Sequence, residues 1–396
     1  MKKLNRRQVI TAAAAASFGL AANSFFLNKK EKSEAAIAPV VIVGGGMAGA
    51  TVAKYIRYWS AKSIPVILID KNASYTSNVM SNLVLTGQKT LSSLAYPYTT
   101  LKSTTYGVTV YQGTVSGADI NKATKTIRYR NSSNVLSAPI TYSKLVLAPG
   151  LDFLPITGLF TAGSTGTNIV VGAWQAGAET QSLRDQLVAM PMDGKFIISI
   201  PKKPYRCPPG PYERAALVAD WIKKNRRSAG NTSPQVFVLD GNSTYTVEPE
   251  NFGYAFNTLH AGVVSYLPNA TITSISTSTV PGSSIAITGT VNVSFSTGGS
   301  ASLPANVINI IAPQTAGQVA RDAGLATAGP VAGGGYFCPV DEMTYMSSVN
   351  SDIYVIGDAC STANQPKAGH MANAQAKVAA DAIIRSLNAM DPDPSP

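Results

Sequence analysis

A glycine-rich turn between an apolar run and a helical segment constrains the fold of this chain more than any other feature. The apolar run 39–43 is followed by Gly44-Gly45-Gly46-Met47-Ala48-Gly49 and then by a segment typical of a helix. A second apolar run, 65–69, ends in Asp70. This order of strand, glycine turn, helix, strand and acid is the fingerprint of a dinucleotide-binding βαβ unit.

Each part of this fingerprint has a physical role. Gly44 permits the tight turn, Gly46 lets the backbone approach a pyrophosphate, and Gly49 lets the helix pack close to the strand. The start of the helix, at Met47 and Ala48, offers free N–H groups to phosphate. Asp70 follows about 20 residues later, where an acid accepts hydrogen bonds from a ribose. The pattern alone leaves both FAD and NAD open.

The first 36 residues are typical of an export signal. Lys2, Lys3 and the pair Arg6-Arg7 precede an alanine-rich apolar run that ends near Ala22. A signal of this kind with adjacent arginines indicates the twin-arginine route, and therefore a periplasmic protein. A retained membrane anchor is the alternative, although the run is short for a span of about 20 residues. No span is expected in the mature chain.

Charge and cysteine content narrow the function further. The formal charge is +11, much of it in the first 36 residues, and no basic block with interleaved aromatic residues occurs. Nucleic-acid binding is therefore not expected. The chain has three cysteines, which permit one disulfide and one free thiol in an oxidising compartment. Their spacing matches neither a zinc site nor a CxxCH haem attachment site.

A buried strand is expected at 144–148, before the turn Pro149-Gly150, and a second βαβ unit follows it. Residues 196–200 and 236–240 are apolar runs, and a helix is expected from about residue 212 to 225. The intervening loop, 201–211, contains five prolines and lacks the glycine fingerprint. Proline has no N–H and a fixed φ, so we interpret this unit as a dinucleotide fold that has lost its nicotinamide site. An unusual but working site is the alternative.

The end of the chain carries a second flavoprotein signature. After a Ser/Thr/Gly-rich section, 242–304, expected to be rich in strands, and a buried strand at 307–311, an apolar run leads into Gly357-Asp358. A helix from about residue 370 to 387 follows. The aspartate of such a turn reaches the ribityl chain, and the helix N-terminus points to the flavin pyrimidine. Paired with the glycine turn, this signature favours FAD over NAD.

These patterns predict an α/β protein with two Rossmann-like domains. The FAD domain is expected to be discontinuous, over 37–155 and 313–396. The second domain, over 156–312, is expected to have the NAD(P)-type fold with a degenerate site and a β-rich section.

Cys207 and Cys338 each sit in a proline-bordered turn that we expect at a domain edge near the flavin. A disulfide in such a place relays electrons, because a thiolate or sulfide attacks one sulfur and the other adds to the flavin. A structural clamp between domains is the alternative. Cys360 is expected to be a small buried residue.

The chain resembles the flavoprotein subunit of flavocytochrome c sulfide dehydrogenase, a relative of sulfide:quinone oxidoreductases and of glutathione reductase-type flavoproteins. The string Arg-Cys-Pro-Pro-Gly-Pro-Tyr-Glu-Arg, residues 206–214, is quite specific to that family. The resemblance covers nearly the whole mature chain, and its matching stretches are 44–50, 81–85, 147–153, 205–214, 311–314, 338–341 and 357–360.

The resemblance implies a set of functional residues. Cys207 and Cys338 would be the redox disulfide, and Glu213 would handle protons there, although a first-turn helix acid is an equal alternative. Some members bind the flavin through a cysteine where this chain has Asn78 or Ser77, so FAD should be non-covalent. Family members usually continue past the final helix with a tail that covers the flavin. In addition to the glycine turn, Asp70 and Gly357-Asp358, the residues expected at the cofactor are Lys71, Asn82, Val115, Ala148, Gly150 and Lys367.

The resemblance implies FAD-dependent oxidation of sulfide or another small thiol, with electrons passing to a c-type cytochrome subunit. A quinone- or NADH-linked oxidoreductase is one alternative. A non-catalytic electron-transfer or assembly protein that keeps the fold is another.

Overall fold

The structure is a computed structural model, and it describes residues 37–156, 170–280, 283 and 287–395. From Ala38 onward, the described residues form one compact unit. The predicted export signal, 1–36, lies outside the described residues, so the twin-arginine route stays a prediction.

The first sheet has the order β22-β10-β1-β2-β5-β8. All of its neighbouring strands pair in parallel except β5 and β8. The strands expected at 39–43, 65–69 and 144–148 are present as β1, β2 and β10. Strand β22, from near the end of the chain, pairs with β10 and completes this sheet. The strands are β22 (Ile353–Val355), β10 (Lys144–Leu147), β1 (Val40–Val43), β2 (Val66–Asp70), β5 (Thr109–Thr114) and β8 (Arg130–Asn131).

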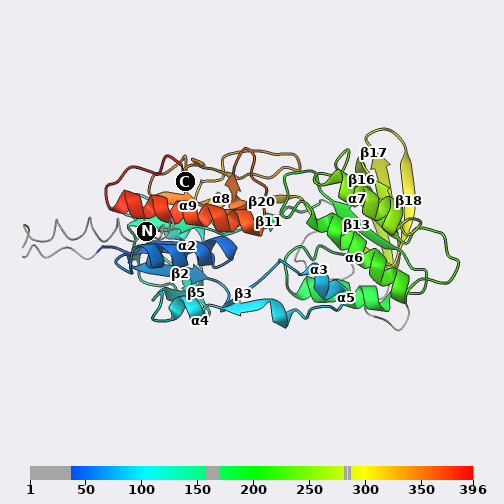
Figure 1. The fold of residues 1–396 in the computed structure, drawn as a ribbon, viewed down its shortest axis with the longest axis horizontal. Coiled ribbons are helices and arrows are strands. Elements are labelled where there is room, and N and C mark those ends of the chain that lie inside the picture. Colours follow the sequence, from blue (N-terminus) through cyan, green and yellow to red (C-terminus); the bar gives the residue numbers. More distant parts are fainter. Residues whose placement is uncertain (1–36, 157–169, 281–282, 284–286, 396) are drawn as a thin grey trace, which may run out of the picture. The chain divides into compact units, whose positions relative to one another are not determined.

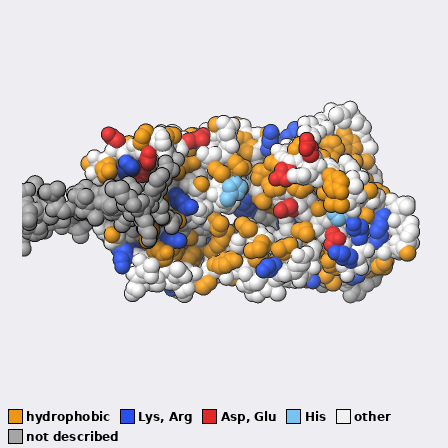
Figure 2. All heavy atoms as spheres, viewed as in Figure 1, with side chains coloured by type: hydrophobic (Ala, Val, Ile, Leu, Met, Phe, Trp, Pro, Cys, Tyr) orange, Lys and Arg blue, Asp and Glu red, His pale blue; other side chains and the backbone are white. Residues whose placement is uncertain are grey.

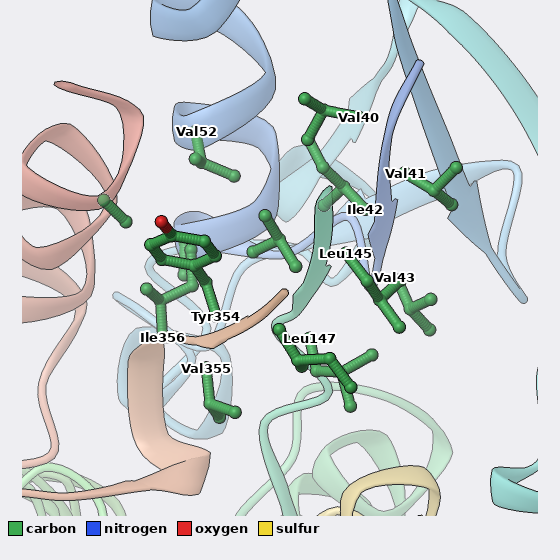
Figure 3. Close-up of a cluster of buried hydrophobic side chains, with 14 of the residues drawn as sticks. Val40, Val41, Ile42, Val43, Val52, Leu145, Leu147, Tyr354, Val355 and Ile356 are labelled. Carbon is green, nitrogen blue, oxygen red and sulfur yellow. The ribbon is translucent and has the colours of Figure 1, made fainter. Parts of the chain in front are cut away.

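Two long helices pack beside each other on this sheet. They are α2 (Met47–Trp59) and α9 (Gly369–Leu387), which lie side by side in Figure 1 and are joined by a 3.0 Å hydrogen bond from Asn373 Nδ2 to Thr51 Oγ1. Figure 3 shows the apolar core, in which β1, β10 and β22 place aliphatic side chains beside Val52 of α2. Burial of these side chains fixes the order of the central strands.

The second sheet is parallel throughout, in the order β12-β19-β13-β14-β15. The runs 196–200 and 236–240 form strands as expected, and the helix between them, α6 (Gly210–Asn225), begins at Gly210. The strands of this sheet are β12 (Val170–Val171), β19 (Val307–Ile310), β13 (Phe196–Ile200), β14 (Val236–Asp240) and β15 (Val264–Leu267). Helix α5 (Ala178–Ala189) lies between β12 and β13 in the chain.

The section 242–304 is only partly the expected run of strands. It contains an antiparallel sheet of β16 (Ala270–Thr279), β17 (Ile287–Phe295) and β18 (Ser300–Ala305). However, α7 (Pro249–Tyr254) and a π-helical turn (Ala255–Leu259) precede these strands, so the expectation of strands is wrong there. Pro249 occupies the first helical turn, where its fixed φ favours a helix start.

Among the described residues, the fold also contains short helices and four small strand groups outside the two main sheets. The helices are α3 (Asn82–Leu85), α4 (Thr99–Lys102) and α8 (Gln318–Asp322), and the strand groups are β3 (Ser74–Thr76) with β4 (Ala95–Pro97), β6 (Ile120–Asn121) with β7 (Thr126–Ile127) and β9 (Ile140–Thr141), β11 (Leu151–Phe153) with β20 (Gln314–Ala316), and β21 (Cys338–Pro339) with β23 (Cys360–Ser361).

The surface in Figure 2 shows basic side chains scattered among apolar and acidic ones over the visible face. A search of the described residues found no helix with the length and apolar character that a membrane span needs.

Candidate functional site

A cavity of about 1630 Å³ opens at the carboxyl ends of the strands of the first sheet. The turns after β1, β2, β10 and β22 all contribute to its wall. Ligands of open parallel sheets bind at this edge. The expected cofactor residues that line it are Gly44, Gly46, Met47, Ala48, Asp70, Lys71, Asn82, Ala148, Gly150, Gly357 and Asp358.

The three glycines of the first turn are needed for different reasons. Gly44 has φ +100°, and a Cβ there would collide with the carbonyl oxygen of Ala148. A Cβ on Gly49 would collide with the carbonyl oxygen of Gly44, so Gly49 serves helix packing and does not line the cavity. Gly46 faces open space, where the nearest atom to an added Cβ is in Tyr75, 3.7 Å away. The room at Gly46 fits the close approach of a dinucleotide phosphate.

Asp70 is held in place by the turn that it faces. Its Oδ2 accepts a 2.6 Å hydrogen bond from the N–H of Gly45, and its Oδ1 accepts one of 2.7 Å from Asn72. Tyr98 supports the same turn, because its hydroxyl donates to the Gly45 carbonyl at 3.1 Å. The carboxylate is therefore fixed on the cavity wall, at the place expected of a ribose acceptor.

Two helices begin at this cavity. The first residues of α2 and of α9 line it, and neither helix has a side-chain cap in the described structure. Uncapped N–H groups and the positive end of the helix dipole favour an anion or a reduced flavin ring. The wall therefore has a suitable donor group at each end of a dinucleotide, and the residues present fit FAD.

The Gly357-Asp358 turn is fixed by buried polar contacts. Gly357 has φ +77°, and its N–H donates to Gln375 Oε1 at 2.8 Å. Asp358 forms an ion pair with Arg206 at 3.8 Å, while burial raises the pKa of the Asp358 carboxyl. The turn thus links the flavin signature at the end of the chain to the loop that carries Cys207.

Cys207 is the expected catalytic cysteine that faces the cavity. It lines the wall together with Glu213 and has a left-handed backbone, with φ +56°. Its N–H donates to the Lys367 carbonyl at 2.7 Å, and its own carbonyl accepts from Gly210 at 2.8 Å. Burial and the nearby Glu213 carboxylate raise the pKa of the Cys207 thiol.

The structure does not contain the expected disulfide. Cys207, Cys338 and Cys360 are all free, and Cys338 is fully buried and does not line the cavity. The backbone places Cys338 beside Cys360, because the two are registered partners in the β21–β23 pair. Both expected cysteines nevertheless interact with Lys367. The Cys207 N–H donates to the Lys367 carbonyl, and the positive charge of the Lys367 ammonium acts to lower the pKa of the Cys338 thiol.

Two other expected cofactor residues do not line the cavity. Val115 is buried in the apolar core that follows β5. Lys367 lies half-buried beside the cavity: its Nζ donates to the carbonyls of Asp358 and Cys360, both at 2.8 Å, and lies 3.7 Å from the Phe337 ring centroid. Burial lowers the pKa of this ammonium.

The second sheet has an acid where a nicotinamide cofactor would need one, but its oxygens are already used. Asp240 ends β14 and is fully buried. Its Oδ2 accepts hydrogen bonds from Tyr212 at 2.7 Å and Tyr266 at 2.9 Å, and its Oδ1 accepts two from Asn242. Together with the proline loop, these bonds indicate that the site has been filled by protein side chains.

Sequence reasoning missed two residues of the site. Trp174 lines the cavity and donates from Nε1 to the Arg206 carbonyl at 3.1 Å. Arg214 lies fully buried behind the wall, with its guanidinium carbon 4.6 Å from the Trp174 ring centroid. Arg214 is the last residue of the string 206–214, so the sequence marks it as part of a family motif. That it is buried beside Trp174 follows only from the tertiary structure.

Comparisons with known proteins support the fold. Residues 38–180 match the family model of pyridine nucleotide-disulphide oxidoreductases. Residues 180–312 match the model of the central part of the sulfide dehydrogenase [flavocytochrome c] flavoprotein chain. Both matches confirm the resemblance and the predicted fold class.

Solved structures show the same arrangement at low identity. The sulfide:quinone oxidoreductase of Aquifex aeolicus has a TM-score of 0.68 at 16% identity, covering 89% of this chain and 77% of that one. The NAD-dependent persulfide reductase of A. fulgidus has a TM-score of 0.62 at 17% identity, covering 87% of this chain and 59% of that one. This chain therefore spans less than two thirds of the reductase, and the likeness establishes a shared fold.

Proposed function

We propose that this chain oxidises sulfide or another small thiol. The proposal starts from the two family matches, of residues 38–180 to the pyridine nucleotide-disulphide oxidoreductases and of residues 180–312 to the central part of the sulfide dehydrogenase [flavocytochrome c] flavoprotein chain. The observation that carries the proposal is the position of Cys207. A cysteine in a proline-bordered loop lines the same cavity as the glycine turn and the Gly357-Asp358 turn. This position supports a sulfur that reacts beside the cofactor site.

In the proposed reaction the oxidised form holds a Cys207–Cys338 disulfide; the two thiols are free in the structure. Sulfide attacks the sulfur of Cys207, because that cysteine lines the cavity and Cys338 does not. A sulfur–sulfur bond forms at Cys207, the bond to Cys338 breaks, and Cys338 leaves as a thiolate with the electron pair. Glu213, on the same wall, takes the proton that sulfide loses.

The cofactor of this proposal is FAD, held without a covalent bond. When bound, it supplies a two-electron acceptor that can release electrons singly. The glycine turn and Asp70 would hold its pyrophosphate and ribose, and Asp358 and the start of α9 would hold the ribityl chain and the ring. Asn78 lines the cavity and accepts a hydrogen bond from the Ala176 N–H, and it offers no thiol for a covalent link.

The proposed electron acceptor is a c-type cytochrome on a separate subunit in the periplasm. The family match to the flavocytochrome c flavoprotein chain supports it, as does the twin-arginine pattern of the first residues. Anaerobically reduced protein should transfer electrons to an added c-type cytochrome. Slower reduction of the cytochrome than of a water-soluble quinone would favour the quinone-linked alternative.

The decisive experiment is stopped-flow reduction of the flavin by sulfide, normalised to bound FAD. Cys207→Ser and Cys338→Ser should abolish the reduction while FAD stays bound. Cys360→Ser is the matched control, because it removes a buried thiol beside Cys338 and should leave the rate unchanged. Unchanged rates in the first two variants would overturn the proposal and favour a non-catalytic role.

A further inference from the structure

Arg214 is a buried cation whose hydrogen-bond partners among the described residues are all neutral. Its side chain is fully buried, and among the described residues it forms no ion pair with a carboxylate. All of its acceptors are neutral: Asn82 Oδ1 and Asn309 Oδ1 at 2.9 Å, the Ala173 carbonyl at 2.8 Å and the Gly172 carbonyl at 3.4 Å.

A charge in such a position is costly unless an anion compensates it at some stage. Hydrogen bonds to neutral oxygens orient the guanidinium but leave its net charge in the protein interior. Burial lowers the pKa of Arg214 to about 9, and the group that counteracts this effect is the Cys207 thiolate. The charge of Arg214 is therefore not offset by a carboxylate of the described residues, and the Cys207 sulfur is the group whose negative charge would offset it.

Geometry brings the sulfur of Cys207 and this cation against the same indole ring, that of Trp174. A Cβ on Gly210 would lie 2.9 Å from Cys207 Sγ and 2.9 Å from Trp174 Cη2, so the sulfur and the edge of the indole are neighbours. The Arg214 guanidinium stacks on the same indole, 4.6 Å from its ring centroid. The sulfur and the indole thus line the cavity, and the cation packs on the buried side of the same indole.

The other charged side chains near Cys207 already have partners. The Arg206 cation acts to lower the pKa of the Cys207 thiol, but it also forms an ion pair with Asp358, whose carboxylate acts in the opposite direction. The Lys367 ammonium donates to the carbonyls of Asp358 and Cys360. The Glu213 carboxylate disfavours a negative charge on the Cys207 sulfur. The Tyr205 hydroxyl also interacts electrostatically with Cys207. Arg214 is the buried cation near Cys207 whose charge has no acid opposite it.

We infer that Arg214 is a positioning residue for Cys207, which supplies the positive charge that stabilises an anionic sulfur there. On the side of Cys338, the Lys367 ammonium lies 3.7 Å from the ring centroid of Phe337, the preceding residue, and its positive charge acts to lower the pKa of the Cys338 thiol. The anionic sulfur on Cys207 is the thiolate of the reduced pair. This inference rests on the proposed role of Cys207 as a reacting sulfur.

The test measures the Cys207 thiol without any substrate. In a holoprotein with Cys338→Ser and Cys360→Ser, the rate of alkylation by iodoacetamide is followed against pH. Arg214→Gln should raise the pKa of Cys207 and slow alkylation at pH 7.5 by roughly tenfold, since an opposite charge at close range shifts a pKa by about one unit or more. Arg214→Lys should restore much of the rate.

A matched control and a second variant keep the result interpretable. Arg184→Gln removes another arginine that donates to a backbone carbonyl, that of Leu85 on α3, and should leave the Cys207 profile unchanged. If Arg214→Gln fails to fold, Asn82→Asp places a carboxylate at the guanidinium Nε and should raise the pKa of Cys207 in the same direction.

An unshifted alkylation profile in Arg214→Gln or in Asn82→Asp would overturn the inference and leave Arg214 a structural residue. A shifted profile in Arg214→Gln, combined with a wild-type protein whose flavin is not reduced by sulfide, would overturn the proposed function and leave the inference standing.

Discussion

The backbone N–H of Cys207 donates a 2.7 Å hydrogen bond to the carbonyl of Lys367. The two residues are far apart in the sequence, one in the loop before α6 and the other just before α9. The bond attaches the proline loop to the segment that also carries the Gly357-Asp358 turn. The sulfur that we propose to react is therefore held at the cofactor cavity by the backbone.

The purified protein should carry FAD that acid releases. Asn78 lines the cavity and has no thiol, so precipitation with acid should leave the yellow chromophore in the supernatant. Absorbance of supernatant and pellet measures this directly. Flavin that stays with the pellet would contradict non-covalent binding, and protein that neither contains nor takes up FAD would contradict the cofactor assignment.

Two glycines of the first turn should respond differently to substitution. Gly46→Ala should leave the free energy of unfolding of the apoprotein nearly unchanged, because an added Cβ meets nothing closer than 3.7 Å. It should weaken FAD binding strongly, since the methyl group would occupy the space we assign to the pyrophosphate. Fluorescence titration with FAD and urea unfolding separate the two effects; full affinity in Gly46→Ala would refute the assigned position.

Gly44→Ala should instead destabilise the protein itself. Its φ of +100° and the collision with the Ala148 carbonyl oxygen should lower the free energy of unfolding by at least about 2 kcal/mol. Gly324→Ala is the matched control, with φ +70° but no atom within 4 Å of an added Cβ, and should cost about 1 kcal/mol. Equal losses in the two variants would show that the close contact at Gly44 does not matter.

NADH and NADPH should reduce the flavin poorly. Asp240 already accepts hydrogen bonds from Tyr212, Tyr266 and Asn242, and the loop from Pro201 to Pro211 cannot surround a pyrophosphate. Anaerobic mixing with excess NADH should give rates far below an ordinary turnover of about 10 per second. Rapid bleaching by stoichiometric NADH would show that the second site still works.

The reduced protein should lose stability at alkaline pH through its buried thiols. Burial raises the pKa of Cys338 to about 12 and of Cys360 to about 11. Above the ordinary thiol pKa of about 8.5 the unfolded chain loses these protons while the folded chain keeps them, so the free energy of unfolding falls as pH rises.

Each thiol should contribute a slope of about 1.4 kcal/mol per pH unit in that range. Cys360→Ser should therefore make the decline between pH 9 and pH 10 shallower than in the wild type. Urea unfolding of the reduced proteins at these two pH values provides the measurement. Equal slopes would mean that Cys360 titrates in the folded protein as it does in the unfolded chain.

Local patterns determined the fold of this protein. The glycine turn, the Gly357-Asp358 turn and the apolar runs of both sheets depend on residues close together in the sequence, so strands β1, β2, β10, β13, β14 and β22 were all expected where they form. Periodicity could not reveal the helical turns at 249–259, because the Ser/Thr/Gly-rich composition around them favours strands and a single Pro249 begins the helix.

Only the tertiary structure decided which expected residues meet at the cavity. Contacts such as Cys207 with Lys367, or Arg214 with Asn82, join segments whose separation in sequence carries no signal of their distance. The sequence supplied the two cysteines, but packing places Cys207 on the cavity wall and Cys338 away from it, beside Cys360. The charge of Arg214 is likewise a property of its surroundings, because its burial, and the lack of an ion pair with any described carboxylate, arise only when distant elements pack together.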